Sequence, residues 1–178
     1  SCKKIIKKTI IENKIDIIFL YGAITNGIQT IQIAKELKIP IIFRLLDISH
    51  GLVQIPILKN LAKKYESIVL SNSIKVLATT PDLSRYAIEM GAKKEHVESF
   101  PLGINIDNFK PLEIDISFRE SLGISENDDV VIFVGTIYPF AGLTQIVNNF
   151  ENLKKVNPNI KLLIVGGGPS YSQLKKLV

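Results

Sequence analysis

The segment ESFPLGINIDNFKP, residues 98–111, leads out of a predicted short strand and is dense in residues that shape a loop. Pro101 fixes its own backbone φ angle, whereas Gly103 tolerates conformations and close contacts that other residues resist. Asn105 suits a turn, because its side chain can accept a hydrogen bond from a nearby backbone amide. An ordinary structural turn explains the proline and the glycine, but it explains the whole series less readily. We therefore expect Pro101, Gly103 and Asn105 to lie in a functional loop.

The chain before this segment alternates between strand and helix patterns. A nearly continuous apolar run at residues 15–21 is typical of a strand that is buried on both faces. At residues 80–91 the helix signals are complete, since Thr80 suits the N-cap, Pro81 the first helical position and Gly91 the position beyond the end. By the same patterns we expect further strands at 39–46, 74–79 and 96–100, and further helices at 2–14, 25–38 and 56–65.

After the segment the same alternation resumes. A helix is expected at residues 117–123, where Ser117 and Glu120 have the spacing of a capping box. Helical spacing then runs from about Leu143 to Val156. We also expect strands at 130–135 and 161–166, and a last helix that continues to Val178.

This alternation predicts an α/β protein with Rossmann-like parallel sheets and helices on both faces. The proline-bearing stretch 110–117 is the most natural boundary, and it divides the chain into domains at 1–111 and 112–178. About four strands precede the boundary and about two follow it, and two strands with two helices do not make a stable sheet alone. We therefore expect both domains to be partial and the chain to be an internal piece of a larger protein, as its start at Ser1 also suggests.

Composition excludes several classes of protein. The single cysteine, Cys2, rules out a disulfide framework and a cysteine-rich metal site, and no apolar run reaches the ~18 residues that cross a bilayer. No signal-peptide pattern opens the chain, so we expect a cytoplasmic protein. The net charge of +5 favours nucleic acid, an anionic membrane face or phosphorylated substrates, or is simply a solvated surface. Without tryptophan or a basic patch interleaved with aromatics, nucleic acid is not an expected partner.

Two further strand ends are rich in glycine, at VGTIYPFAGL (134–143) and VGGGPS (165–170). Ligands of parallel sheets bind at the carboxyl ends of the strands, and the free N–H groups of a following helix attract phosphate. A dinucleotide fingerprint fails because Tyr171 stands where its third glycine belongs, and the chain has no P-loop motif. His50 and His96 lie far apart without cysteines or an HExxH motif, so a zinc site is not expected. No GxSxG elbow marks a hydrolase nucleophile.

Three stretches in series resemble the sequence patterns of glycosyltransferase family 4, whose enzymes have the GT-B fold. The first is IDIIFLYG…IPIIFRLLD, which resembles P-D-x-x-H followed by I-P-x-V-x-x-x-H-D. The second is FPLGINIDNFKP, which resembles P-N-G-V-D-x-x-x-F-x-P. The third is VVIFVGTIYPFAGL…KLLIVGGGPSYSQLKKL, which resembles V-G-R-L-x-x-x-K-G-x-x-x-L followed by L-x-I-V-G-x-G-P-x-x-x-x-L. The resemblance covers nearly the whole chain in the family's order.

The resemblance implies a glycosyltransferase that moves a sugar from a nucleotide-diphosphate donor to a glycan, glycolipid or lipid-linked acceptor. It places the acceptor on the first domain and the donor on the second, with Pro101, Gly103 and Asn105 on the hinge side of a cleft. It implies no metal and no cofactor, because stabilisation of the charge on the leaving phosphate carries the reaction. Asp47 carries over as a catalytic candidate, with His50 as a stand-in for the family's histidine. The donor site would consist of Gly135, Thr136, Gly142, Leu143, Gly166 and Gly168.

The chain departs from the family pattern at the positions that hold the donor phosphates. Thr136 replaces the family's arginine and Ala141 its lysine, and two lost charge-assisted contacts cost about 1.5–3 kcal/mol each. Leu46 replaces the histidine before Asp47. These departures leave open a catalytically degenerate GT-B module that binds or regulates, and the fold also admits a nucleotide-sugar epimerase, against which the segment 98–111 argues. We expect this chain alone to transfer no sugar.

Family members that act on lipid-linked acceptors associate with membrane surfaces. A peripheral contact with the cytoplasmic membrane face is therefore a further expectation. The basic helix at 2–14 and Lys59, Lys63 and Lys64 are the candidates for it, although solvated helices explain the same residues. A lipid surface is thus a partner to test alongside the nucleotide sugar.

Overall fold

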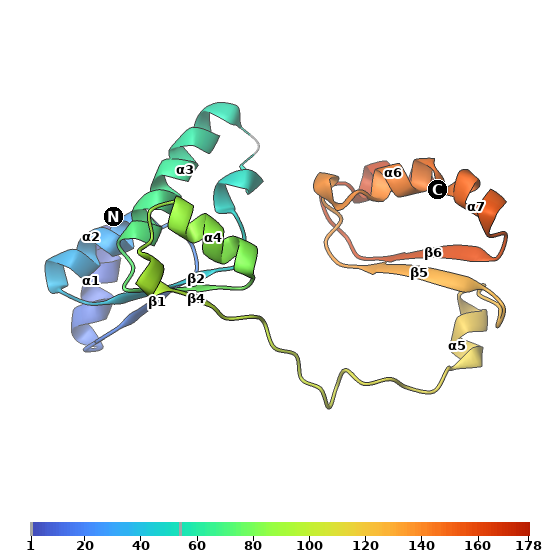
Figure 1. Ribbon diagram of the computed structural model, residues 1–178, viewed down its shortest axis with the longest axis horizontal. Coiled ribbons are helices and arrows are strands. Elements are labelled where there is room, and N and C mark those ends of the chain that lie inside the picture. The colour runs from blue at the N-terminus through green and yellow to red at the C-terminus, as the bar shows by residue number, and fades with distance from the viewer. Residues whose placement is uncertain (1, 54) are drawn as a thin grey trace. The chain divides into compact units, whose positions relative to one another are not determined.

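The computed structural model describes residues 2–53 and 55–178 of a chain that divides into two units, Ser1–Phe109 and Lys110–Val178 (Figure 1). Each unit is built around its own parallel sheet. The α/β class and the parallel sheets predicted from the sequence are therefore confirmed.

The N-terminal unit contains a four-stranded parallel sheet whose strands lie side by side in chain order. One row of paired residues crosses all four strands through Leu20, Phe43, Val76 and Val97. The first three are buried, and Val97 packs against the same core, so this row marks the centre of the unit. The strands are β1 (Ile18–Leu20), β2 (Ile41–Leu45), β3 (Lys75–Ala78) and β4 (Val97–Ser99).

Helices connect these strands, and α4 begins and ends as the sequence predicts. The Thr80 hydroxyl accepts a hydrogen bond from the Leu83 amide at 3.2 Å, and Gly91 beyond the end has a φ of 103°. α3 runs past its predicted end at residue 65, because residues 66–71 continue the helical spacing into the core. None of the described helices is long and apolar enough to cross a membrane. The helices are α1 (Cys2–Glu12), α2 (Gly27–Leu37), α3 (Pro56–Ser71) and α4 (Pro81–Glu89), with short 3₁₀ turns η1 (Ser49–Leu52) and η2 (Lys94–His96).

The first strand is shorter and less buried than predicted. Leu20 of β1 lies in the core, but Phe19 is 49% exposed and Tyr21 beyond the strand is 62% exposed. β1 is the edge strand of the described sheet, and its alternate side chains point to opposite faces. The expectation that residues 15–21 are buried on both faces was therefore wrong for one face.

The C-terminal unit has two parallel strands that pair over six residues, from Asp129 with Ile160 to Val134 with Val165. In Figure 1, α6 and α7 lie on one side of this sheet. The other face leaves Ile132 57% exposed and Val134 71% exposed, so the helical layer expected on that face is not observed among the described residues. The elements are α5 (Ile116–Ser121), β5 (Asp129–Val134), η3 (Pro139–Ala141), α6 (Leu143–Asn148), α7 (Phe150–Val156), β6 (Ile160–Val165) and α8 (Tyr171–Leu174).

Three helix boundaries in this unit differ from the expectations. Asp115 caps α5 by accepting a hydrogen bond from the Phe118 amide at 2.9 Å, and Ser117 donates its hydroxyl to the same carboxylate instead of capping the helix. The helix expected from 143 to 156 breaks at Asn149, whose side-chain amide donates to the Gln145 carbonyl and so competes with the helical backbone. The last helix ends at Leu174 rather than at the end of the chain.

Candidate functional site

The two glycine-rich loops of the C-terminal unit are bound to each other at the carboxyl ends of β5 and β6. The Gly135 amide donates to the Val165 carbonyl at 3.0 Å, and the Ile137 amide donates to the Gly167 carbonyl at 2.8 Å. The Ser170 amide returns a bond to the Ile137 carbonyl at 3.0 Å. These backbone bonds extend the pairing of the two strands into their loops, which makes the loops one rigid surface.

Gly166 and Gly168 let the loops approach this closely. A Cβ atom at Gly166 would overlap the carbonyl oxygen of Gly135, and one at Gly168 would lie 2.9 Å from both the backbone N and O of Ile137. No side chain fits at that separation without movement of the backbone. The structure thus gives these two glycines a packing role, and their predicted contact with a donor stays a prediction.

Gly142 and Leu143 form the start of α6 beside these loops. Gly142 has a φ of 75°, a conformation that favours glycine, and no atom lies within 4 Å of where its Cβ would be. No side chain caps α6, and the amides of a first helical turn have no partner within the helix. Leu143 is only 3% exposed and packs with Ile137 and Leu174, so it can offer a ligand its backbone amide but not its side chain.

The loop between β5 and α6 is exposed on its outer side. Thr136 is exposed, and its hydroxyl is the one polar side-chain group of the loop 135–142 other than the Tyr138 phenol. The rings of Tyr138 and Phe140 stack on each other with centroids 4.9 Å apart and an angle of 11° between their planes. The two rings thus pack on each other while both remain exposed.

In the N-terminal unit, His50 is held by a buried glutamate that sequence reasoning missed. The side chain of Glu66 is completely buried on α3, and its Oε2 lies 2.8 Å from His50 Nδ1. The same carboxyl group accepts hydrogen bonds from the Ser49 amide at 3.0 Å, the His50 amide at 3.3 Å and the Tyr86 hydroxyl at 2.9 Å. One side chain of α3 therefore fixes both the backbone and the ring of the turn that follows β2.

The pKa of Tyr86 responds to this cluster. Burial of the phenol, its hydrogen bond to Glu66 and the negative charge of Glu66 all raise the pKa of Tyr86. The Tyr86 hydroxyl also lies 3.1 Å from His50 Nδ1. A signal for Glu66 was present in the sequence, because Ala62, Glu66 and Val69 follow core spacing on α3 and a carboxylate at a core position needs partners.

Asp47 shares the turn after β2 with His50, but the structure places the two differently. Asp47 is exposed, whereas the His50 side chain retains only 14% of its accessible surface. Both residues are thus at the carboxyl end of β2, as expected for a site in a parallel sheet. Their catalytic roles stay predictions.

Arg44 was also missed, and it connects β2 to the segment 98–111. This arginine is 4% exposed, and its Nη1 donates to the Phe100 carbonyl at 2.6 Å and to the Leu77 carbonyl at 3.4 Å. Its guanidinium also lies 4.9 Å from the centre of the Phe100 ring. A lone arginine in the apolar run IPIIFRLL was the signal, since a buried cation needs acceptors.

The remainder of the segment 98–111 is exposed, including Pro101 and Gly103. The Asn105 side chain accepts a hydrogen bond from the Asp107 amide at 2.9 Å, which is the turn role expected of it. Gly103 has neither a positive φ nor an atom near its missing Cβ, so the described loop does not require glycine there. Phe109 is 70% exposed, so its ring fills no apolar gap in its unit. The hinge role of Pro101, Gly103 and Asn105 stays a prediction.

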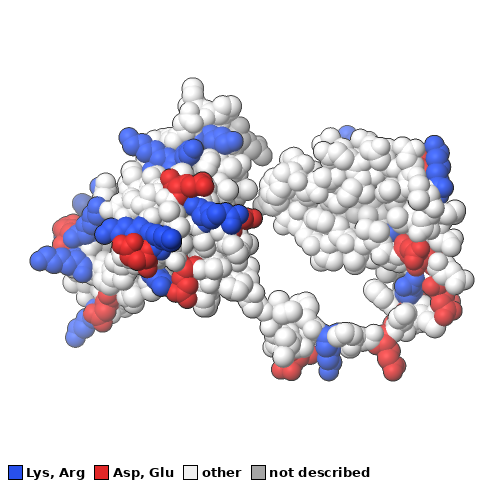
Figure 2. Space-filling view, in the orientation of Figure 1, with Lys and Arg blue, Asp and Glu red and all other residues white. Residues whose placement is uncertain are grey.

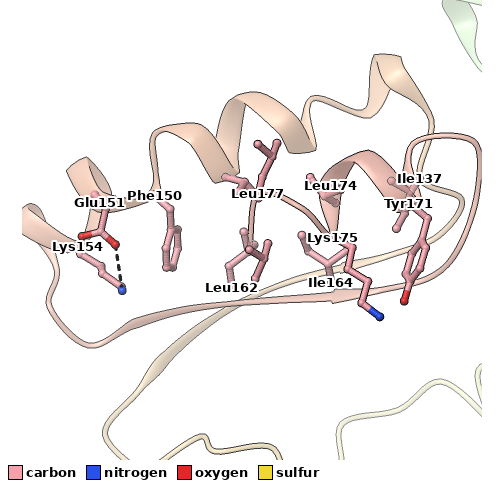
Figure 3. A pocket seen from close by; sticks show the side chains of 12 residues that line it. Ile137, Phe150, Glu151, Lys154, Leu162, Ile164, Tyr171, Leu174, Lys175 and Leu177 are labelled. Carbon is pink, nitrogen blue, oxygen red and sulfur yellow. Dashed lines mark hydrogen bonds and ion pairs between the residues drawn. The ribbon is translucent and has the colours of Figure 1, made fainter.

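A cavity of about 570 Å³ is bounded by α7, α8 and β6 of the C-terminal unit (Figure 3). Its lining is mostly apolar, and two of its charged side chains, Glu151 and Lys154, pair with each other at 3.3 Å. Among the described residues, Ile137 is the only one from the loops at the strand ends that lines this cavity. The third charged side chain, Lys175, lies over the Tyr171 ring. A mostly apolar cavity with one cation that is unpaired in the described part of the chain suits a nucleotide diphosphate less well than the glycine loops, which remain the candidate donor site.

Comparison with known proteins finds glycosyltransferases similar to parts of this chain. Residues 115–178 match the family model described as Glycosyl transferases group 1. The alpha-monoglucosyldiacylglycerol synthase of Acholeplasma laidlawii is 24% identical over 178 aligned residues, which cover 93% of this chain and 45% of that protein. The D-inositol 3-phosphate glycosyltransferase of Nocardia farcinica is 27% identical over 114 residues, covering 62% and 25%. The chain therefore spans less than half the length of these relatives.

Solved structures show the same fold. The Anabaena protein HepE, crystallised with UDP and glucose, matches 99% of this chain with 46% of its own, at a TM-score of 0.77 and 18% identity. The UDP-GlcNAc 2-epimerase of Neisseria meningitidis, bound to UDP-GlcNAc, covers 99% of this chain with 50% of its own, at a TM-score of 0.60 and 15% identity. The GT-B fold and the resemblance to glycosyltransferases of this group, both inferred from the sequence, are confirmed.

Proposed function

We propose that this chain is part of a glycosyltransferase that transfers a sugar from a nucleotide-diphosphate donor to a glycan, a glycolipid or a lipid-linked acceptor. Residues 1–111 would form the acceptor side and residues 112–178 the donor side. Three findings support this class: the match of residues 115–178 to the glycosyltransferase family model, the two glycosyltransferase relatives, and the UDP and glucose held by HepE.

The observation that carries the proposal is the pair of interlocked glycine loops within the segment that matches the family. The first of these loops contains Thr136 and leads to Gly142 at the uncapped start of α6. Backbone amides at a helix start bind phosphate oxygens, and a hydroxyl adds one further donor. In this proposal the donor diphosphate accepts hydrogen bonds from the amides of Gly142 and Leu143 and from the Thr136 hydroxyl. Gly135 lines the site but donates no bond, because its amide already bonds to the Val165 carbonyl. Gly166 and Gly168 support those contacts by holding the loops together.

Asp47 and His50 are the proposed contacts for the acceptor. A group that receives the proton of an attacking hydroxyl needs to be oriented and within reach of it. His50 is oriented by Glu66, and Asp47 lies exposed in the same turn. We assign His50 and Asp47 to the acceptor hydroxyl on this basis, with Glu66 as a positioning residue for His50.

The donor site would work without a metal ion or another cofactor. Its chemistry relies on amides, a hydroxyl and the helix start to stabilise charge on the leaving nucleotide diphosphate. Addition of EDTA should therefore leave the affinity for UDP unchanged, whereas a metal-bridged diphosphate would lose affinity when the metal is removed.

A substitution at residue 136 tests the donor site by restoring the positive charge that the family pattern has there. Thr136→Arg should tighten the binding of UDP about 10- to 100-fold, because a charge-assisted hydrogen bond contributes about 1.5–3 kcal/mol. The affinity for uridine, which has no phosphate, should not change. Val156→Arg is the control. It adds the same charge on α7, at a residue that is 87% exposed. The proposal that the diphosphate binds at this loop would be refuted if calorimetric titrations showed equal effects for both variants, or no effect for Thr136→Arg.

A GT-B module that binds without catalysis is the second candidate, favoured by Thr136 and Ala141 in place of the family's cations. Both candidates bind the nucleotide. They differ in turnover of the whole protein from which this chain derives: a transferase releases UDP in the presence of an acceptor, and a binding module does not.

A further inference from the structure

The loop between β5 and α6 carries two aromatic side chains, Tyr138 and Phe140, which we call the ring pair. Their planes are 11° apart and their centroids are 4.9 Å apart. Carbon atoms in contact are about 3.5–4.0 Å apart, so the two rings are offset rather than superposed. Phe140 is nevertheless 71% exposed and Tyr138 is 42% exposed. Because one face of Phe140 lies against Tyr138, its exposed surface belongs mainly to the opposite face and to the ring edge.

The backbone holds the ring pair in a fixed position. Ile137, the residue before Tyr138, is only 2% exposed, and its amide and carbonyl both bond to the second glycine loop, at 2.8 and 3.0 Å. The Tyr138 carbonyl accepts a hydrogen bond from the Ala141 amide at 3.0 Å, which closes the turn η3. An aromatic surface that is fixed before a ligand arrives loses little conformational freedom when the ligand binds.

The end of the C-terminal unit that carries the ring pair has no charged side chain. Residues 130–150 and 162–174 contain no Asp, Glu, Lys or Arg. In Figure 2 this end of the unit is white, whereas charged side chains gather toward its opposite end. The polar side-chain groups of the loop 135–142 are the Thr136 hydroxyl and the Tyr138 phenol. The surface therefore suits an uncharged ligand that combines a flat apolar face with hydroxyl groups.

The size of the ring pair also limits its ligand. A stable protein interface buries about 600–1,000 Å² on each partner. An aromatic side chain offers about 150–250 Å² when it is fully buried. Two rings that already cover part of each other thus match one small ring rather than a second protein surface.

A pyranose ring has the required properties. Most hydroxyl groups of glucose are equatorial, so each face of its ring presents mainly C–H groups. These hydrogens carry partial positive charge, because each ring carbon is bonded to oxygen, and they are attracted to the negative face of an aromatic ring. The sugar hydroxyls at the ring edge donate and accept hydrogen bonds, as do the hydroxyls of Thr136 and Tyr138.

We propose that the ring pair binds a pyranose ring, which stacks on the outer face of Phe140. A nucleobase also stacks on aromatic rings, but its edge is typically read by amide, carboxylate or guanidinium side chains, and residues 135–142 contain none of these. The source of the sugar, donor or acceptor, rests on the proposed function. In either case the ring pair selects sugars by shape, because an axial hydroxyl on the stacked face would hold the two rings apart.

Two titrations of this chain test the proposal and distinguish the sources. Calorimetry with UDP-glucose and with UDP gives a ratio of affinities that isolates the glucosyl group of the donor. Saturation-transfer NMR with methyl β-D-glucopyranoside, without nucleotide, reports on an acceptor sugar, and open-chain sorbitol is its ligand control. Phe140→Leu keeps an apolar side chain but removes the aromatic face. It should lower either the affinity of UDP-glucose relative to UDP or the affinity for the glucoside about 2- to 10-fold, whereas Phe140→Tyr should retain both.

Phe118→Leu is the matched control, since Phe118 is an exposed phenylalanine of the same unit, on α5, and it should change neither reading. The proposal is overturned if Phe140→Leu changes neither reading, if Phe118→Leu has the same effect, or if sorbitol receives saturation as strongly as the glucoside. Equal weakening of UDP and UDP-glucose by Phe140→Leu would also overturn it, because the rings would then stack on the base.

The outcomes separate this proposal from the proposed donor site. Transfer to the glucoside that depends on Phe140, in a chain that does not bind UDP, would retain the ring pair and refute the donor site. Tighter UDP binding by Thr136→Arg, with no dependence of either reading on Phe140, would retain the donor site and refute the ring pair.

Discussion

Replacement of Glu66 should destabilise the N-terminal unit more than any exposed substitution, because four groups depend on its carboxyl. The Ser49 amide approaches Oε1, while the His50 amide, the His50 ring and the Tyr86 hydroxyl approach Oε2. Glu66→Gln keeps one acceptor oxygen but turns an NH₂ group toward at least one donor, which costs about 1–3 kcal/mol. Glu66→Ala removes every acceptor from a fully buried site and should cost about 3–5 kcal/mol.

The assay must report on the N-terminal unit alone, because two units can unfold separately. Hydrogen exchange of the β2 and β3 amides in increasing urea gives that local free energy of unfolding. In Glu66→Ala the amides of Ser49 and His50 should also lose protection, since both donate to this side chain. Glu89→Gln is the matched control on exposed α4 surface and should change stability by about 0.5 kcal/mol or less.

A double-mutant cycle sharpens this prediction. Glu66→Ala and Tyr86→Phe should be coupled by about 0.5–3 kcal/mol, because they remove the two ends of one hydrogen bond. The reasoning would be refuted if Glu66→Ala proved as mild as Glu89→Gln, or if the cycle showed no coupling.

Four further substitutions test other parts of the account. Gly166→Ala should destabilise the C-terminal unit by about 1–3 kcal/mol in urea, since its Cβ would meet the other loop, whereas Gly167→Ala has open space and should be nearly neutral. The raised pKa of Tyr86 means that the unfolded phenol ionises first, so the N-terminal unit should lose stability as the pH rises above about 10, and Tyr86→Phe should reduce that loss in melting curves recorded against pH. Asp115→Ala should lower the Tm of the C-terminal unit by removing the cap of α5, while Asp115→Asn should retain it. Arg44→Gln should cost about 1.5–3 kcal/mol and speed amide exchange at the start of the segment 98–111, and unchanged exchange there would contradict the anchoring role.

The parts of the fold that follow local rules were predictable from the sequence. The apolar runs specify the strands of both sheets, and Thr80 and Gly91 mark the ends of α4, because a cap and a terminal glycine act within one turn. The α5 cap was misassigned because Asp115 and Ser117 both suit the role and lie two residues apart. The break at Asn149 depends on one side-chain amide that competes with the backbone, which helical spacing does not record.

The sequence predicted which loops form the candidate sites, but it did not predict the side-chain and backbone contacts within them. The sequence indicated glycines at both strand ends, yet the need for Gly166 and Gly168 arises between two loops about thirty residues apart in the chain. His50 was named from a family pattern, whereas its partner Glu66 lies on a different element. Arg44 likewise acts across the sheet on the Phe100 carbonyl. Such contacts depend on tertiary packing, so a single sequence offers only indirect signals, such as a charge at a core position.

The most direct test of the proposed donor site is an amide-resolved NMR titration of this chain with UDP and with uridine. The account predicts that UDP shifts the amides of Gly135, Thr136, Gly142 and Leu143, that uridine shifts them much less, and that amides of the N-terminal unit such as Gly22 stay in place. Absence of any shift up to about 10 mM UDP, where even weak binding is saturated, would contradict the account, as would shifts confined to the cavity beside α7 and α8.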